Sequence, residues 1–180
     1  FRQPDLARTI RGMMAAEKAA LAKKGATRQM GIDAVRDYFY RGEIAKKIDE
    51  FSRSRDGLLR YEDLAAFRLT PEEPLMTEFR GAKVYKPGFW SQGPAMLETL
   101  NMLSGVDLAQ MRYNSAQYIH TVTEALKLAY ADRDTYYGDP KFVKIPQEEL
   151  LSQKYAAERR ALIGPKASQE FQPGNFGLKN

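Results

Sequence analysis

The sequence predicts a helix-rich α+β fold in which strands are the minority element. Over most of the chain, apolar residues recur at the three- and four-residue spacing of helices that bury one face. In one short stretch they alternate instead, with Phe79 and Val84 on either side of Arg80-Gly81. This stretch predicts a small hairpin that ends at Pro87.

Composition limits the class of protein. The 180 residues carry a net charge of +5, and none is cysteine, which excludes disulfides and thiolate chemistry. Lysine and arginine are scattered among acids on helical faces, which argues against nucleic-acid binding. The chain begins at Phe1 without a signal peptide or an apolar segment long enough to span a membrane. We therefore expect residues 1–180 to be a single domain portion of a fragment or a processed chain.

The first fifty residues predict three helices. Asp5 is expected to cap a helix that runs to about Lys24 and ends at Gly25. Two shorter helices, "IDAVRDYFY" and "GEIAKKIDEF", are separated by Gly42. The predicted buried stripe of the second consists of Ile44, Ile48 and Phe51.

The segment between Phe67 and Glu78 is expected to be an irregular extended strand, because it contains Pro71 and Pro74. Three further helices are predicted after the hairpin. The first starts at Pro94, ends at Gly105 and has the inward face Met96, Leu97, Leu100 and Leu103.

The next helix is expected to begin after Asn114, which can cap it while Gln117 reaches back. Its predicted stripe consists of Ile119, Val122, Leu126, Ala129 and Tyr130. The last helix covers about 151–163. Residues 165–180 then form an extended or mobile tail that is rich in Gly, Asn and Gln.

The stretch "YADRDTYYGDP" contains three acids, Asp132, Asp134 and Asp139, that could in principle bind a hard cation. The spacing does not fit a calcium loop, because the sixth residue from Asp132 is tyrosine and the twelfth is valine. Arg133 can pair with Asp134, and Asp139 can bond backbone amides in a turn. We therefore favour a structural role over a metal or acid/base site.

The loop "GFWSQGP" joins the hairpin to a helix and is the second candidate site. Amides near Gly93 could face an anion, but Ser91 is not a hydrolase nucleophile elbow, because Phe89 occupies one of the two required glycine positions. Two interpretations remain open. Trp90 fills a hydrophobic gap, or the loop is the wall of a site. The single histidine, His120, is expected to be partly buried and hydrogen-bonded.

The sequence resembles the large subunit of gamma-glutamyltransferases. The resemblance covers Gln3 to about Arg160 and rests on "QPDLARTI", "FYRGEIAKKI", "GLLRYEDLAAF", "FRGAKVY", "LNMLSGVDL" and "EALKLAYADRDTYYGDPKFV" in this order. It implies the C-terminal part of that subunit, within a four-layer αββα sandwich of an N-terminal nucleophile hydrolase. It also implies self-cleavage, a small subunit with an amino-terminal threonine nucleophile, and no metal or organic cofactor.

The resemblance assigns no catalytic residue to this chain, because the threonine and the substrate-binding arginine of the family lie outside it. Where many members have a proline-rich run ending in Ser-Ser-Gly-Gly, this chain has "KPGFWSQGP". Trp90, Ser91 and Gln92 are therefore candidate residues of a pocket wall with altered specificity. The resemblance favours a periplasmic or secreted protein that could form a higher oligomer. A beta-lactam acylase on the same fold and a catalytically silent binding module remain alternatives.

Overall fold

The structure is a computed structural model that describes residues 2–177. It divides into two compact units, Phe1–Pro71 and Glu72–Asn180, which are described separately. Each unit is mostly helical, and the second contains one antiparallel hairpin. None of the helices in the described part of the chain is long and apolar enough to cross a membrane. The single domain portion expected for 1–180 stays a prediction.

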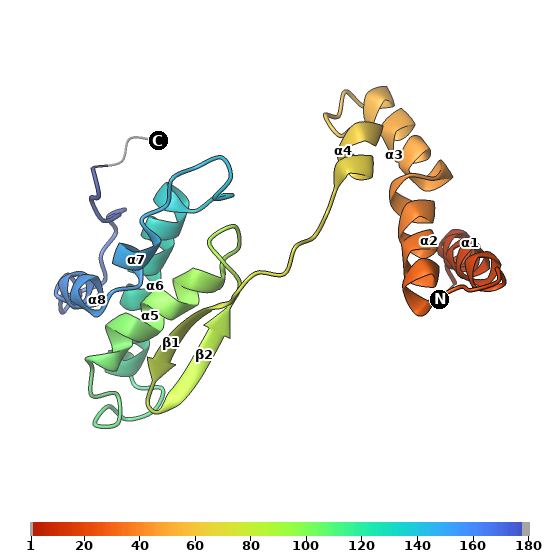
Figure 1. Cartoon of the computed structure of the whole chain (residues 1–180). Helices are drawn as coiled ribbons and strands as arrows, with labels where there is room; N and C mark the ends of the chain where they lie inside the picture. Colours follow the sequence, from red (N-terminus) through yellow and green to blue (C-terminus); the bar gives the residue numbers. More distant parts are fainter. Residues whose placement is uncertain (1, 178–180) are drawn as a thin grey trace. The chain divides into compact units, whose positions relative to one another are not determined.

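The first unit consists of four helices: α1 (Pro4–Leu21), α2 (Arg28–Tyr40), α3 (Glu43–Ser54) and α4 (Tyr61–Ala66). Figure 1 shows α1 lying beside α2, and Gly31 permits this close approach because a side chain there would meet Leu21. Among the described residues of this unit, only Gly31 and Ala45 are buried. Large apolar side chains such as Ile10, Met14 and Phe51 remain exposed. The unit therefore has an open apolar surface rather than a closed core.

Several details of these helices differ from the prediction. Asp5 lies inside α1, which begins at Pro4, because proline suits the first helical turn. α2 begins four residues earlier than expected, where the hydroxyl of Thr27 accepts from the amide of Met30 (3.3 Å). Phe51 was predicted to be buried and is 64% exposed.

The helix α4 was not predicted. Its start is stabilised by Asp63, which accepts a hydrogen bond from the amide of Arg60 (2.8 Å). Beyond it, Phe67 and the residues up to Pro74 form no strand. The predicted extended strand is therefore confined to β1 (Leu75–Phe79).

The second unit starts with the predicted hairpin. β1 pairs with β2 (Ala82–Lys86) in an antiparallel register that places Phe79 opposite Ala82. Arg80 and Gly81 form the two-residue turn with positive φ angles of 52° and 80°. Positive φ at both positions matches the twist of the two strands.

Four helices complete the second unit: α5 (Gly93–Ser104), α6 (Ala116–Tyr136), α7 (Gln147–Leu150) and α8 (Gln153–Arg160). α5 contacts the hairpin, α6 and α8, so it is buried on more than one side (Figure 1). This explains why the single-stripe prediction fails at Met96, which is 45% exposed, although Leu97 and Leu103 are buried as predicted. The short helix α7 was not predicted.

The buried face of α6 is rotated from the predicted stripe. Ala129 is buried as predicted, but Ile119 and Tyr130 are exposed. The charged residues Glu124 and Asp132 are buried instead. The apolar periodicity was misleading here because this face buries charged residues. The cap is Ser115, whose hydroxyl accepts from the amide of Tyr118 (3.2 Å), and not Asn114.

The chain beyond α8 has no helix or strand as far as residue 177. His120 of α6 is partly buried and donates to the carbonyl of Gly164 (2.8 Å), as predicted for the single histidine. Whether the 165–180 tail is mobile stays a prediction, and its last three residues lie outside the described part of the chain.

Candidate functional site

The loop between β2 and α5 is held in place by Phe89. This ring is 1% exposed and makes an edge-to-face contact with Tyr137, with 4.7 Å between the ring centroids. It belongs to an apolar cluster with Tyr136, Leu150 and Tyr155. The residue that fills the hydrophobic gap is therefore Phe89, and the interpretation that assigned this role to Trp90 is wrong.

Trp90 is 54% exposed and lies on the outside of the loop. Its indole Nε1–H donates to Oε1 of Glu72, 2.7 Å away. The ring is thus fixed in direction while much of its surface is free to contact a ligand or another polypeptide. This arrangement is compatible with a pocket wall.

The hydroxyl of Ser91 is used within the loop itself. It donates to the carbonyl of Gly88 (3.0 Å) and accepts from the amide of Gly93 (3.0 Å). The amide that could have faced an anion is therefore already paired. Ser91 therefore closes the turn. Within residues 2–177 its hydroxyl donates to a backbone carbonyl and not to a side-chain base that could activate it as a nucleophile.

Gln92 connects the loop to α6. Its Oε1 accepts from Nη1 of Arg133 (2.7 Å), and the same guanidinium pairs with Asp134 at 2.7 Å. The Arg133 side chain also lies over the ring of Tyr130, 4.5 Å from its centroid. The predicted pairing of Arg133 with Asp134 is present, and it orients the guanidinium toward Gln92.

A buried polar cluster lies beneath this surface. Asp132 is 0% exposed, and its Oδ2 accepts from the hydroxyl of Tyr155 (2.8 Å) and lies 3.3 Å from Nε of Arg159. Glu98 of α5 is 2% exposed, and its Oε1 accepts from the hydroxyl of Tyr137 (2.6 Å). The cluster joins α5, α6 and α8 through charged groups rather than through apolar packing.

Burial raises the pKa of Glu98 well above its ordinary value, and the neighbouring Asp132 raises it further. Burial also raises the pKa of Asp132, although the amide of Gly174, Arg159 and Tyr155 partly oppose this effect. Two carboxyl groups in one desolvated site next to one arginine favour a state with a single proton, held by Glu98.

The three acids of "YADRDTYYGDP" therefore have three different partners. Asp132 is in the buried cluster, Asp134 pairs with Arg133, and Asp139 accepts from the amide of Lys141 (2.9 Å) in a turn. Within residues 2–177 no group of three or more His, Cys, Asp or Glu side chains could hold a metal ion. This arrangement supports the structural interpretation of the stretch.

Sequence reasoning missed Glu98 and Arg159 as members of the buried cluster. A signal for Glu98 was available, because it is the one charged residue within the otherwise apolar or small stretch "GPAMLETLNMLSG". An acid in the centre of a helix with apolar residues on both sides requires a buried partner. Arg159 had no such signal, since it lies among the charged residues Glu158 and Arg160 at the end of α8.

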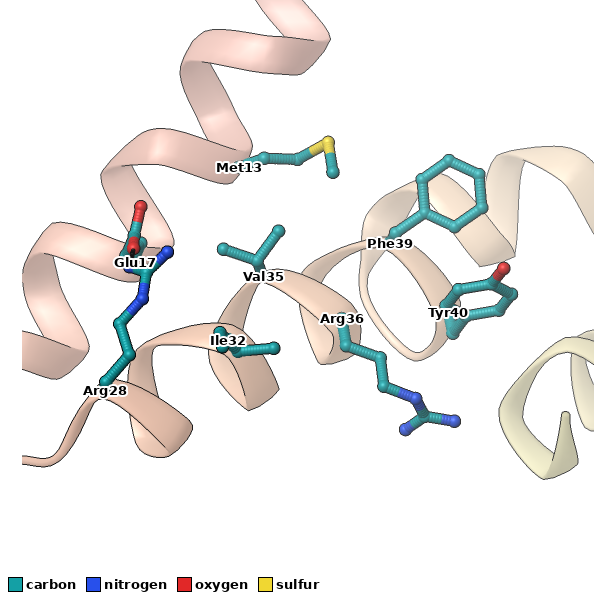
Figure 2. A pocket seen from close by; sticks show the side chains of 8 residues that line it. All are labelled: Met13, Glu17, Arg28, Ile32, Val35, Arg36, Phe39 and Tyr40. Carbon is teal, nitrogen blue, oxygen red and sulfur yellow. Dashed lines mark hydrogen bonds and ion pairs between the residues drawn. The ribbon is translucent and has the colours of Figure 1, made fainter. Parts of the chain in front are cut away.

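Each unit also has a groove away from the loop. In the first unit a groove of about 520 Å³ lies between α1 and α2, where Met13 lies opposite Val35 and the ion pair of Glu17 with Arg28 lies at one end (Figure 2). In the second unit a groove of about 580 Å³ lies between α6 and residues 167–171. Neither groove includes the predicted wall residues Trp90, Ser91 and Gln92.

Replacing Glu98 by glutamine is expected to reduce the pH dependence of stability above pH 4.5, the ordinary pKa of this side chain. Above that pH the unfolded state releases a proton that the folded state retains, so stability falls as the pH rises toward the folded-state pKa. Melting temperatures between pH 4.5 and 9 measure this slope. Glu98→Gln should have a smaller slope than the wild type, whereas the exposed control Glu78→Gln should retain it. Equal slopes for Glu98→Gln and the wild type would contradict the assignment.

Arg133→Ala is expected to lower the free energy of unfolding by about 1 kcal/mol, because it removes a partly exposed charged hydrogen bond to Gln92. Gln92→Ala removes the same bond, so the double variant should cost less than the sum of the two single variants. Urea unfolding measures all three. An Arg133→Ala protein whose stability equals that of the wild type would count against this role.

Comparison with known proteins identifies the family. A family model described as gamma-glutamyltranspeptidase matches residues 1–178. The glutathione hydrolase proenzyme of Pseudomonas sp. (strain A14) is 36% identical over 176 residues, which cover 96% of this chain and 28% of that protein. The acylase ACY 1 proenzyme of Pseudomonas sp. (strain SE83) is 34% identical over 142 residues, which cover 78% of this chain and 25% of that protein.

The fold comparison agrees with the sequence comparison. The solved structure of LmbA2991HD matches with a TM-score of 0.85 and 37% identity, over 98% of this chain and 30% of that one. The chain thus spans less than a third of the length of these relatives. The match over nearly all of its length means that the chain belongs to the gamma-glutamyltranspeptidase family.

Proposed function

We propose that this chain is the C-terminal part of the large subunit of a self-processing gamma-glutamyltransferase, and that it supports a catalytic threonine located in a small subunit. The observation that carries the proposal is the family match over residues 1–178. Relatives that are proenzymes and several times longer support a partner that comes from the same precursor. The open apolar surface of the first unit supports the same conclusion, because a unit with two buried residues needs further protein to cover it.

In this proposal the chain is one portion of a four-layer αββα sandwich, and the hairpin and helices α5 and α6 add to its layers. Residues 1–180 act as a single domain portion once the small subunit is present. The buried cluster around Asp132 keeps α5, α6 and α8 in fixed positions, as a supporting layer requires.

The proposed reaction is an acyl transfer in two steps. The hydroxyl of the amino-terminal threonine attacks the carbonyl of a gamma-glutamyl amide, and its own amine takes the proton and delivers it to the leaving amine. The C–N bond breaks and a glutamyl ester remains. Water or the amine of an amino acid or peptide then attacks the ester, the ester C–O bond breaks, and the threonine hydroxyl regains its proton from the attacking group. Backbone amides of the small subunit stabilise the oxyanion in both steps. No metal or organic cofactor enters this scheme.

Trp90, Ser91 and Gln92 are proposed to form part of the wall on the acceptor side of the pocket. The support is that Trp90 is exposed and fixed by Glu72, and that the loop is bound to α6 through Gln92. A rigid aromatic surface reduces the size of a pocket and selects acceptors by shape. Ser91 contributes through the turn that it closes.

A beta-lactam acylase is the second candidate function, and the acylase ACY 1 relative favours it, since its identity of 34% is close to the 36% of the glutathione hydrolase relative. The two activities differ in the acyl group, since a glutaryl side chain lacks the alpha-amino group of a gamma-glutamyl one. The groups that bind the acyl side chain therefore decide between them, and not the acceptor-side wall.

The full-length proenzyme is expected to cut itself into two subunits and to hydrolyse a gamma-glutamyl anilide faster than a glutaryl amide. The 180-residue chain alone should hydrolyse neither, because the nucleophile lies outside it. Release of the anilide chromophore measures both rates. Faster turnover of the glutaryl amide would favour the acylase, an uncleaved proenzyme would favour the silent binding module, and full activity of the isolated chain would refute the proposal.

Trp90→Ala is expected to change the KM for the acceptor in the transfer reaction severalfold, while the rate of hydrolysis stays near that of the wild type. The reason is that hydrolysis needs only water on the acceptor side. Trp90→Phe is the matched control, since it keeps an aromatic ring and loses the bond to Glu72. If the acceptor KM values of Trp90→Ala are unchanged for a panel of small and large amino acids, Trp90 is not part of the pocket wall.

A further inference from the structure

Gly174, in the segment after α8, is held by two hydrogen bonds and packs closely against Tyr155. Its amide donates to Oδ1 of Asp132 (2.7 Å), and its carbonyl accepts from the hydroxyl of Tyr136 (2.6 Å). A Cβ atom at this position would lie 2.0 Å from the hydroxyl oxygen of Tyr155, so only glycine fits. The backbone at residue 174 is therefore fixed in position and in orientation.

The residues on either side are attached to the same helices. The ring of Phe176 packs against those of Tyr136 and Tyr155, with centroid separations of 5.1 and 5.0 Å. On the other side, the carbonyl of Gln172 accepts from the guanidinium of Arg159. We call Gln172, Gly174 and Phe176, together with their four partners Asp132, Tyr136, Tyr155 and Arg159, the tail anchor.

The segment is attached to α6 at a second place, Ser168, which lies nearer to α8 in the sequence. The amide of Ser168 donates to Oε2 of Glu124 (3.3 Å), and its carbonyl accepts from the ammonium group of Lys127. Glu124 and Lys127 also pair with each other at 2.7 Å. Since α6 supplies the partners in both places, the segment from 168 to 176 follows this helix over several turns.

The buried cluster depends on this segment. The carboxylate of Asp132 is fully buried, and its Oδ1 accepts a hydrogen bond from the amide of Gly174 (2.7 Å). If the backbone at Gly174 shifted while the carboxylate stayed buried, that oxygen would lose this donor, which is unfavourable. The apolar core that α5 and α6 share does not include Asp132, so the charged cluster binds the segment in addition to linking the helices.

We propose that the tail anchor positions the chain for self-cleavage of the proenzyme, with Asp132 and Gly174 as positioning residues. The inference rests on the proposed function, in which the threonine follows this segment in the precursor. In the cleavage step the threonine hydroxyl attacks the preceding carbonyl, the C–N bond breaks, and the hydroxyl proton passes to the released amine. Water then hydrolyses the ester, which frees the carboxylate. Such an attack requires the reacting atoms to be held close together, and a fixed residue in the segment that leads to the bond limits the conformations of the chain.

The test compares two glycine substitutions in the full-length proenzyme. Gly174→Ala collides with Tyr155, whereas Gly164→Ala, in the same segment, meets no atom within 4 Å. The first-order rate of conversion into two subunits is followed on denaturing gels. Gly174→Ala is expected to slow it by about 100-fold, and Gly164→Ala by less than about twofold. Phe176→Ala, which leaves every polar atom of the anchor in place, should slow it by about tenfold and remains informative if Gly174→Ala does not fold.

A second control separates positioning from stability. Leu103 belongs to an apolar cluster of the second unit that includes Met102 and Leu128 and is separate from the cluster around Phe89. Leu103→Ala removes a buried side chain from it and should destabilise the protein without releasing the segment. Cleavage is measured well below the melting temperature of every variant. Under the proposal, Leu103→Ala cleaves near the wild-type rate, and the anchor variants, once cleaved, have wild-type activity per subunit pair. If Leu103→Ala is as slow as Gly174→Ala, or if folded Gly174→Ala cleaves at the wild-type rate, the inference is wrong.

Limited proteolysis of the uncleaved proenzyme tests the anchor without relying on cleavage. The segment should resist protease in the wild type and become sensitive in Gly174→Ala. A protected segment in a wild-type proenzyme that never cleaves itself would overturn the proposed function. A proenzyme that cleaves itself although its segment is sensitive to protease would overturn the tail anchor alone.

Discussion

The second unit depends on one fully buried carboxylate, that of Asp132. A desolvated charge is costly, and Asp132 is stabilised only because α8 provides Tyr155 and Arg159 and the following segment provides the amide of Gly174. Glu98 adds a second carboxyl group, whose pKa is raised by its own burial. An apolar core that includes Met102, Ala125 and Ala156 also holds these helices together. The charged cluster adds specificity for one arrangement, because each donor and acceptor has a fixed direction.

The two units are stabilised in different ways. In the second, Leu97, Met102 and Leu150 are among the large side chains that are fully buried, and the buried acids Asp132 and Glu98 each accept a hydrogen bond from a tyrosine. The first has helices of similar length but almost no buried side chain, and its apolar residues line a groove and an open surface. Its helices are formed, but their apolar faces are incompletely buried. A unit of this kind gains much of its stability from other polypeptide that packs against its apolar surface.

Much of the fold could be predicted from the sequence, since helices and hairpins are encoded locally. The Arg80-Gly81 turn and the α5 boundaries at Pro94 and Gly105 depend on neighbouring residues, and the structure agrees with them. The predictions failed where tertiary contacts decide. The buried face of α6 contains Asp132, which no hydrophobic pattern would place inside, because its partners lie about 25 and 40 residues further along the chain. For the same reason Phe89, rather than the larger Trp90, is the residue that enters the core.

The close contact of Gly174 with Tyr155 also restricts how the two positions can change during evolution. While a tyrosine occupies position 155, a side chain at position 174 would collide with its hydroxyl group, so the glycine cannot be replaced. A smaller residue at 155 would open the space but would also remove a donor from the buried acid. Accepted changes must therefore occur as sets, in which the aromatic residue, the glycine and the acid are replaced together, so these three sites should covary among homologues.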